Sequence, residues 1–304
     1  MKAAGYKHSF ALGSIAGSAC LGMLIPPSVL LIVWGIITED SIGKLFVAGV
    51  LPGILLAAFF AAYNMITAKM NPSIAPEPDT LGDVSPLTKG QVYSGAAIVG
   101  LIMLVLGGIW GGFFTATEAA GVGALAGMFI AIAKGLRFKE LVECIIDAGK
   151  TSAPIMILLI TAGMYSRFLS LADIDSLIIG AMTSAGLDGA MGLIVMVIIW
   201  LLLGMLLDSI SIILLTVPLF MTLSSGMDPY AFAIFGILAI EAGLLTPPFG
   251  LIVYTVKGVL SGTGHDVPLN QIFSGSIPYW IMMLIVMILV VIFPGLASWL
   301  TTFV

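Results

Sequence analysis

The stretch Glu241-Ala-Gly-Leu-Leu-Thr-Pro-Pro-Phe-Gly250 lies inside a long apolar segment, yet it cannot form one continuous helix. Proline has no N–H, so the pair Pro247–Pro248 cannot donate helical hydrogen bonds to the carbonyls of Gly243 and Leu244. In lipid, a carbonyl without a donor is costly unless protein, water or an ion satisfies it. The stretch therefore predicts a helix broken within the membrane. Two free carbonyls precede the break, and the helix that begins after it carries partial positive charge at its N-terminus.

The same interruption occurs near the start of the chain, which indicates an internal repeat. Leu21-Gly-Met-Leu-Ile-Pro-Pro-Ser28 aligns with residues 242–249, proline pair on proline pair. With one small gap, the match runs from residues 5–46 onto residues 226–273. Interrupted helices in corresponding positions of two halves are the best sequence pointer to the binding centre of a transporter.

The composition places the chain in a membrane. Its 304 residues are 60% apolar and 9% charged, a balance that predicts an all-α polytopic membrane protein. The net charge of −5 is small and no basic face for nucleic acid is present. Cys20 and Cys144 lie on separate apolar segments, so we expect neither a disulfide nor a metal cluster from them. No nucleophile–base set or phosphate loop suggests an enzyme.

Apolar segments and breaks predict the order of the elements. Broken helices are expected over residues 9–36 and 229–257. Residues 189–223 predict a re-entrant hairpin, because each half is short for a span and the polar stretch Asp208–Ser211 lies in the middle. The other elements are spans over 45–68, 92–110, 118–134, 151–168 and 272–298, an amphipathic interfacial helix over 140–150 and a surface arm helix over 173–187.

Four motifs resemble one known family. They are Leu24-Ile-Pro-Pro-Ser28, Gly112-Phe-Phe-Thr-Ala-Thr-Glu-Ala-Ala120, Leu206-Leu-Asp-Ser-Ile-Ser211 and Glu241–Gly250. In this order they look like the large membrane subunit, of DctM type, of tripartite ATP-independent periplasmic (TRAP) transporters. The resemblance covers essentially the whole chain. It implies an inverted-repeat, elevator-type symporter in the inner membrane of a bacterium or archaeon, driven by a sodium gradient.

The resemblance also implies partners and substrates. The expected partners are a small membrane subunit, a periplasmic solute-binding protein and the lipid bilayer, with no nucleic acid. The expected substrates are C4-dicarboxylates, sialic acids or similar carboxylates. Two alternatives stay open: a channel, which would conduct without ion coupling, and an inactive membrane subunit or fragment that needs another chain.

The regions of the chain follow from the repeat. Residues 1–68 are the remainder of a first inverted repeat, 69–91 a polar loop, 92–150 a connecting helix pair with a basic interfacial segment, and 151–304 the second repeat. Residues 151–221 have no counterpart in the first half. We therefore expect a chain truncated at its N-terminus, with DNA upstream of Met1 that encodes a similar apolar segment containing a Gly/Ser-rich hairpin tip.

Asp208 is the sharpest candidate for a functional residue, because an ionisable group deep in apolar sequence is expensive. Together with serine hydroxyls and free carbonyls it offers the hard oxygen ligands that suit a small cation. We predict Na⁺ as the coupling ion, with a proton as the alternative, and no other cofactor. The predicted ligands are Gly22, Met23, Asp208, Ser209, Ser211, Gly243 and Leu244. The competing interpretation is that Asp208 only caps the half-helix that follows it.

The helix N-termini after the two breaks are the predicted substrate site, because their partial positive charge suits a carboxylate. The residues expected there are Pro27, Ser28, Thr246, Pro248 and Gly250. The hydroxyls of Ser28 and Thr246 can cap a half-helix, contact substrate, or do both. Glu241 has two interpretations, pairing with a neighbouring helix and coupling to transport. Thr115-Ala-Thr-Glu118 has the spacing of a capping box.

The distribution of basic residues predicts the orientation. With the N-terminus in the cytoplasm and a hairpin that enters and leaves on one side, every Lys and Arg except Lys44 and Arg167 falls on the cytoplasmic side. The two repeats are then inverted. Single cysteines introduced at Gly135 or Phe138 should be labelled from the inside, and a cysteine at Gly186 from the outside. Labelling of both regions from the same side would contradict the inverted repeat.

Overall fold

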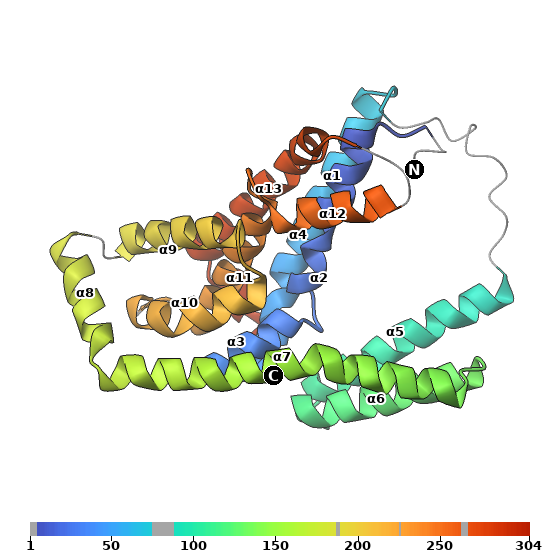
Figure 1. The fold of residues 1–304 in the computed structure, drawn as a ribbon, viewed down its shortest axis with the longest axis horizontal. Coiled ribbons are helices and arrows are strands. Elements are labelled where there is room, and N and C mark those ends of the chain that lie inside the picture. The colour runs from blue at the N-terminus through green and yellow to red at the C-terminus, as the bar shows by residue number, and fades with distance from the viewer. Residues whose placement is uncertain (1–4, 75–87, 187–188, 225, 263–266) are drawn as a thin grey trace. The chain divides into compact units, whose positions relative to one another are not determined.

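The computed structural model describes residues 5–74, 88–186, 189–224, 226–262 and 267–304, and within these ranges its regular elements are helices. In chain order they are α1 (His8–Ala19), α2 (Leu21–Leu24), α3 (Val29–Thr38), α4 (Ile42–Met70), α5 (Lys89–Trp110), α6 (Ala116–Ala133), α7 (Phe138–Leu171), α8 (Ile174–Ser184), α9 (Gly189–Gly204), α10 (Ser209–Leu223), α11 (Pro229–Leu245), α12 (Leu251–Gly262), α13 (Leu269–Ile292), α14 (Gly295–Ser298) and the 3₁₀ helix η3 (Leu300–Phe303) (Figure 1).

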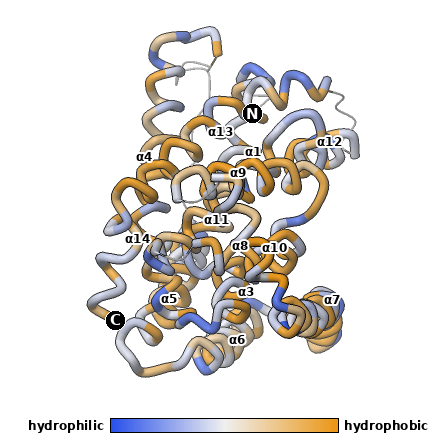
Figure 2. Tube along the Cα trace, turned by 90° about the vertical axis from the view of Figure 1, so that its left-hand side faces the viewer, coloured by the Kyte–Doolittle hydropathy of each residue, from blue (hydrophilic) through white to orange (hydrophobic). Residues whose placement is uncertain are grey.

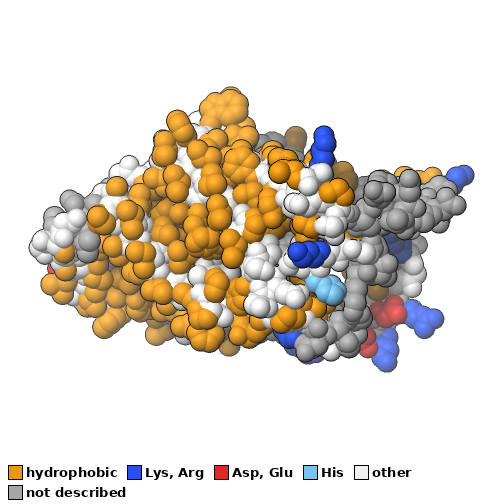
Figure 3. Space-filling model, turned by 90° about the horizontal axis from the view of Figure 1, so that it is seen from above, with side chains coloured by type: hydrophobic (Ala, Val, Ile, Leu, Met, Phe, Trp, Pro, Cys, Tyr) orange, Lys and Arg blue, Asp and Glu red, His pale blue; other side chains and the backbone are white. Residues whose placement is uncertain are grey.

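The prediction of an all-α polytopic membrane protein is confirmed. Among the described residues, α4, α5, α6, α7 and α13 are long and apolar enough to cross a membrane. The bent combination of α1–α2 with α3, at 41°, adds one more if it counts as a single span. Hydrophobic residues predominate along the helices in Figure 2, and the face shown in Figure 3 carries mainly hydrophobic side chains with few charges. Such a surface is suited to lipid or to partner helices.

The chain divides into two compact units. The larger unit comprises Met1–Gly82 and Ala162–Thr302, and the smaller unit comprises Asp83–Thr161 and Phe303–Val304. Both broken helices and the hairpin belong to the larger unit. The candidate site is therefore a property of the larger unit.

The interruptions lie at the two proline pairs. The helix predicted over 9–36 is α1, α2 and α3, and the one predicted over 229–257 is α11 and α12. Both proline–proline peptide bonds are cis. The hairpin predicted over 189–223 consists of α9 and α10, joined by a short turn that lies against α11 (Figure 1).

α11 forms the centre of the larger unit. All fifteen residues from Ala231 to Leu245 are buried, and α13, α9, α4 and α14 pack around the helix. An aromatic cluster lies on one side of it, in which Trp34 and Trp200 are both 0% exposed and have ring centroids 6.5 Å apart. Phe232 and Phe235 of α11 and Phe220 of α10 belong to the same cluster. Edge-on aromatic pairs each add about 0.5–1.5 kcal/mol beyond the area that they bury.

The smaller unit contains the helix pair α5 and α6, joined by a tight turn. Phe114 folds back over Gly108, where a Cβ atom would lie 2.3 Å from the phenylalanine ring. The capping box of α6 is present: Glu118 Oε2 accepts from the Thr115 N–H at 2.9 Å, and Thr115 Oγ1 accepts from the Glu118 N–H at 3.3 Å. This cap explains the Thr115–Glu118 motif without any ligand.

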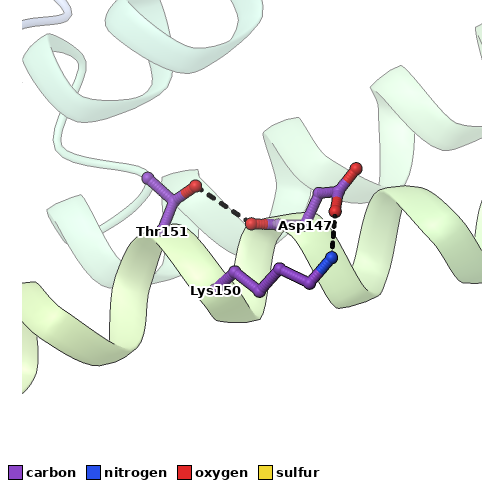
Figure 4. Close-up of polar contacts among 3 residues, drawn as sticks. All are labelled: Asp147, Lys150 and Thr151. Carbon is purple, nitrogen blue, oxygen red and sulfur yellow. Dashed lines mark hydrogen bonds and ion pairs between the residues drawn. The ribbon is translucent and has the colours of Figure 1, made fainter.

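α7 differs from the sequence-based expectation. One helix runs from Phe138 to Leu171, where a separate interfacial helix over 140–150 and a span over 151–168 were expected. At the expected boundary, Lys150 Nζ lies 2.9 Å from Asp147 Oδ1, and the Thr151 hydroxyl donates to the Asp147 carbonyl at 2.9 Å (Figure 4). Both contacts join residues three or four positions apart, as in a regular helix. The change from polar to apolar residues, which suggested a boundary here, therefore does not end the helix.

The last span and the polar loop also need comparison with their expected bounds. The last span, expected over 272–298, is α13 followed by the short α14, because Phe293 precedes Pro294 and leaves the helical region at φ −124°. The polar loop expected over 69–91 lies between the end of α4 and the start of α5, and residues 75–87 of it are outside the described ranges. Lys2, which contributed to the expected orientation, also lies outside them.

Glycines allow α1 and α13 to cross closely. A Cβ atom on Gly275 would lie 1.9 Å from the Ser9 carbonyl oxygen, and one on Gly13 would lie 2.1 Å from the Gly275 carbonyl oxygen. The obstacles are main-chain atoms, which cannot move aside as a side chain can. In membranes, such small-residue crossings provide packing that the hydrophobic effect does not supply.

Gly275→Ala should therefore separate α1 from α13 and lower the free energy of unfolding by about 1–3 kcal/mol, the usual cost of overpacking. Gly258→Ala in α12 is the control, because a Cβ atom at Gly258 meets nothing within 4 Å. The measurement is the melting temperature of the purified protein in detergent. Equal melting temperatures for the two variants would show that the crossing is not tight.

Candidate functional site

The first break, at Pro26–Pro27, is closed by Ser28. Its side chain is 1% exposed, its hydroxyl donates to the Met23 carbonyl, and its oxygen accepts from the Leu31 N–H at 3.4 Å. Ser28 thus ties the end of α2 to the first turn of α3. No described residue donates a hydrogen bond to the carbonyl of Gly22, whose helical donor would have been a proline nitrogen.

The second break, at Pro247–Pro248, is closed by Thr246. Its N–H donates to the Gly243 carbonyl at 2.9 Å, and its hydroxyl donates to the Ala242 carbonyl at 2.9 Å. The same hydroxyl accepts from Trp280 Nε1 of α13 at 3.0 Å. The carbonyl of Leu244 receives no hydrogen bond from a described residue.

Each proline pair deprives two carbonyls of their helical donors, and one of the two stays without a donor among the described residues: Gly22 at the first break and Leu244 at the second. The carbonyls of Met23 and Gly243, which were also expected to be free, accept hydrogen bonds within the protein. The reason is that hydroxyls and an N–H next to each proline pair replace the missing helical donors. This leaves fewer free ligands than the sequence alone suggested.

The predicted substrate-site residues at the breaks differ in their exposure. Pro27 and Pro248 are exposed. Gly250, by contrast, is buried, with φ +47°, and a Cβ atom on it would lie 2.8 Å from the ring of Phe273. The accessible part of the predicted substrate site thus comprises Pro27, Pro248 and the neighbouring exposed Phe249, whereas Gly250 forms the turn.

The hairpin tip contains two separate polar contacts. Asp208 is exposed and caps α10, since its Oδ1 accepts from the Ser211 N–H at 3.1 Å and its Oδ2 accepts from the Ser211 hydroxyl at 2.5 Å. Ser209 is buried and donates its hydroxyl to Glu241 Oε1 of α11 at 2.7 Å. Neighbouring residues of the tip thus face different surroundings.

Glu241 is where the tip and the two repeats meet. Its side chain is 2% exposed. Its carbonyl oxygen lies 4.0 Å from the sulfur of Cys20, the residue that aligns with Glu241 in the internal repeat. The two aligned positions therefore lie against each other at the centre of the larger unit, next to both breaks. Of the two interpretations of Glu241, the structure shows contact with a neighbouring helix, through Ser209.

Glycines bring the hairpin close to the second break. A Cβ atom on Gly243 would lie 2.8 Å from the Trp200 carbonyl oxygen and 2.9 Å from the Cα atom of Gly204. The end of α9 therefore rests directly on α11 beside Leu244. The tip of the hairpin therefore lies next to the second break. The segment that leads into the first break lies there as well, because Cys20 contacts the Glu241 carbonyl oxygen.

Sequence reasoning missed Trp280 and Phe273. Both come from α13, and they contact Thr246 and Gly250 respectively. Phe273 was visible only as the repeat partner of Phe46, and a single tryptophan in an apolar span carries no signal of its partner. Such contacts depend on how α13 packs against α11, which no local pattern encodes.

The two hydrogen bonds of the Thr246 hydroxyl predict a structural effect of its removal. Thr246→Val keeps the shape but leaves the Trp280 N–H and the Ala242 carbonyl without partners, at a cost of about 1–3 kcal/mol in the free energy of unfolding. Thr246→Ser keeps the hydroxyl and should cost less than about 1 kcal/mol, for the lost methyl group. Thermal unfolding in detergent without substrate measures both. Equal stability of the two variants would mean that the hydroxyl does not hold the break.

Comparisons with known proteins agree with this architecture. Residues 1–296 match the family model described as the DctM component of tripartite ATP-independent periplasmic transporters. The chain is 32% identical over 295 residues to the C4-dicarboxylate TRAP transporter large permease protein of Pseudomonas aeruginosa, covering 96% of this chain and 67% of that protein.

Relatives with other named substrates are also similar. The ectoine/5-hydroxyectoine large permease of Ruegeria pomeroyi is 30% identical, with 99% of this chain and 69% of that protein covered. The sialic acid large permease of Vibrio cholerae is 28% identical, with 97% and 68% covered. Together with the apolar helices, these matches identify a multi-pass inner-membrane transport protein. The chain belongs to the DctM component family of tripartite ATP-independent periplasmic transporters.

Proposed function

We propose that this chain is the membrane permease subunit of a sodium-gradient-driven importer of small carboxylates. It works with a small membrane subunit and a periplasmic solute-binding protein. The substrate class rests on relatives named for C4-dicarboxylate and sialic acid transport. The importer function rests on the family and on the geometry of the two breaks.

The observation that carries the proposal is the arrangement at each break. A carbonyl without a donor, on Gly22 or Leu244, precedes an exposed proline and a new helix N-terminus. A carbonyl oxygen attracts a cation, and a helix N-terminus attracts an anion. The Na⁺ ion and the carboxylate of the substrate can therefore bind within one turn of chain from each other, and each ion favours binding of the other.

The hairpin tip supplies the negative charge of the cation site in this proposal. The Asp208 carboxylate is held by Ser211 at the tip, and Ser209 anchors the same tip to α11. Asp208 and Ser211 offer carboxylate and hydroxyl oxygens, and Gly22 and Leu244 offer carbonyl oxygens. Met23, Ser209 and Gly243 belong to the shell that holds these ligands, because their polar groups are engaged within the protein.

Asp208→Asn tests the cation site. Asparagine caps a helix about as well as aspartate, so the structural role is kept while the charge is lost. Losing about 1.4 kcal/mol of cation binding corresponds to a tenfold change. The sodium concentration for half-maximal uptake should therefore rise about tenfold. The assay is uptake of a small carboxylate by proteoliposomes that contain the permease, the small subunit and the binding protein.

Asp228→Asn is the matched control. Asp228 caps α11 in the same way, with its Oδ1 2.9 Å from the Ala231 N–H, but it lies at the far end of that helix from the break. This variant should leave the sodium dependence unchanged. An unchanged sodium dependence in Asp208→Asn as well would reduce Asp208 to a helix cap. Conduction of substrate without any sodium dependence in the wild type would point to a channel.

A further inference from the structure

Glu241 is a buried acid that the proposed ligand set does not use. Among the described Asp, Glu, Lys and Arg residues it alone is buried, and α11 is enclosed on all sides around it. Ion pairs between described residues occur in α7, not at Glu241. A carboxyl group in such surroundings is costly unless hydrogen bonds satisfy it. An ionisable residue at membrane depth is a functional candidate by default.

The contacts of Glu241 connect three segments at one point. Its Oε1 accepts from the hydroxyl of Ser209, the first residue of α10, at 2.7 Å. Its carbonyl oxygen contacts Cys20, which lies between α1 and α2. Two residues further along α11, Gly243 is pressed against Gly204 at the end of α9. The hydrogen bond from Ser209 is thus the polar contact between the hairpin tip and the helix that leads into the second break.

The glycine contact and the hydrogen bond have different effects. Gly243 against Gly204 sets how closely α9 approaches α11, but a contact between glycines does not fix the direction of the tip. A hydrogen bond to a carboxyl or amide oxygen is directional, because it weakens steeply when the angle at the hydrogen departs from linear. Asp208 adjoins Ser209 in the chain, so a fixed Ser209 also limits where the Asp208 carboxylate can lie.

We propose that Glu241 is a positioning residue, whose hydrogen bond to Ser209 holds the Asp208–Ser211 tip in register with the second break. This inference rests on the proposed function, because register matters for transport only if the tip and the break share a cation. Glu241 itself does not contact the cation or the substrate. Its effect reaches the cation through Ser209, so the hydrogen-bond acceptor matters and the charge does not.

Three substitutions and one double variant separate these roles. Glu241→Gln keeps the shape and the Oε1 acceptor, and it should behave like the wild type. Glu241→Met and Ser209→Ala each remove the hydrogen bond and should raise the sodium concentration for half-maximal uptake about two- to tenfold, the size of one lost hydrogen bond between uncharged groups. The double variant Glu241→Met/Ser209→Ala should need no more sodium for half-maximal uptake than either single variant, because all three lack the same hydrogen bond.

A second measurement reports the position of the tip without transport. Amide hydrogen exchange of residues 207–212 in detergent should be about tenfold faster in Glu241→Met and Ser209→Ala than in the wild type or Glu241→Gln. Exchange at the start of α13 is the internal control and should not change. This readout also shows that the variants are folded.

The outcomes sort the two proposals. Unchanged exchange at the tip in Glu241→Met overturns the positioning role, and so does a Glu241→Gln variant that is as impaired as Glu241→Met, because the charge would then be needed. Additive effects in the double variant overturn it as well. Sodium-independent uptake by the wild type counts against the proposed function and removes the coupling on which this inference depends, whereas faster tip exchange would still show the Ser209 contact.

Discussion

The structure depends on one constraint, which is that a helix interrupted inside apolar surroundings must still satisfy its polar backbone groups. The two breaks meet this constraint with different residues. At the first break, the Ser28 hydroxyl donates to the Met23 carbonyl and accepts from the Leu31 N–H. At the second, the Thr246 hydroxyl donates to a carbonyl of α11 and accepts from Trp280 Nε1. The two repeats thus share a broken helix at the same aligned position, but different side chains satisfy the polar groups at each break.

The proposed cation site depends on backbone carbonyls that the breaks leave without a hydrogen-bond donor. The carbonyls of Gly22 and Leu244 keep no donor among the described residues. In the proposed function, such a carbonyl binds a cation that can reach it, and the cost of leaving the carbonyl unsatisfied adds to the driving force for binding. The contacts of Ser28 and Thr246 satisfy one of the two carbonyls that each proline pair leaves without a helical donor, which lowers the cost of each break to the protein.

α11 gives the site its rigidity. Its complete burial, the aromatic cluster around Trp200 and the contact of Gly204 with Gly243 hold the second break against the hairpin. Polar contacts then orient the parts that close packing brings together, as Ser209 does on Glu241 and Trp280 on Thr246. Packing therefore sets the distances between elements, and hydrogen bonds set the directions of the tip and the break.

The sequence by itself determined the membrane class, both helix breaks, the hairpin and the Thr115–Glu118 cap, because each depends on local chemistry. A proline lacks its N–H wherever it lies, and a capping box spans four residues. Only the tertiary structure decided which carbonyls remain free, that Ser209 faces Glu241 while Asp208 stays exposed, and that α7 is continuous. These features depend on donors and obstacles from other segments, such as Trp280 at Thr246 and Gly275 at Gly13, and residues that lie tens to hundreds of positions apart leave no trace of their contact in a local pattern.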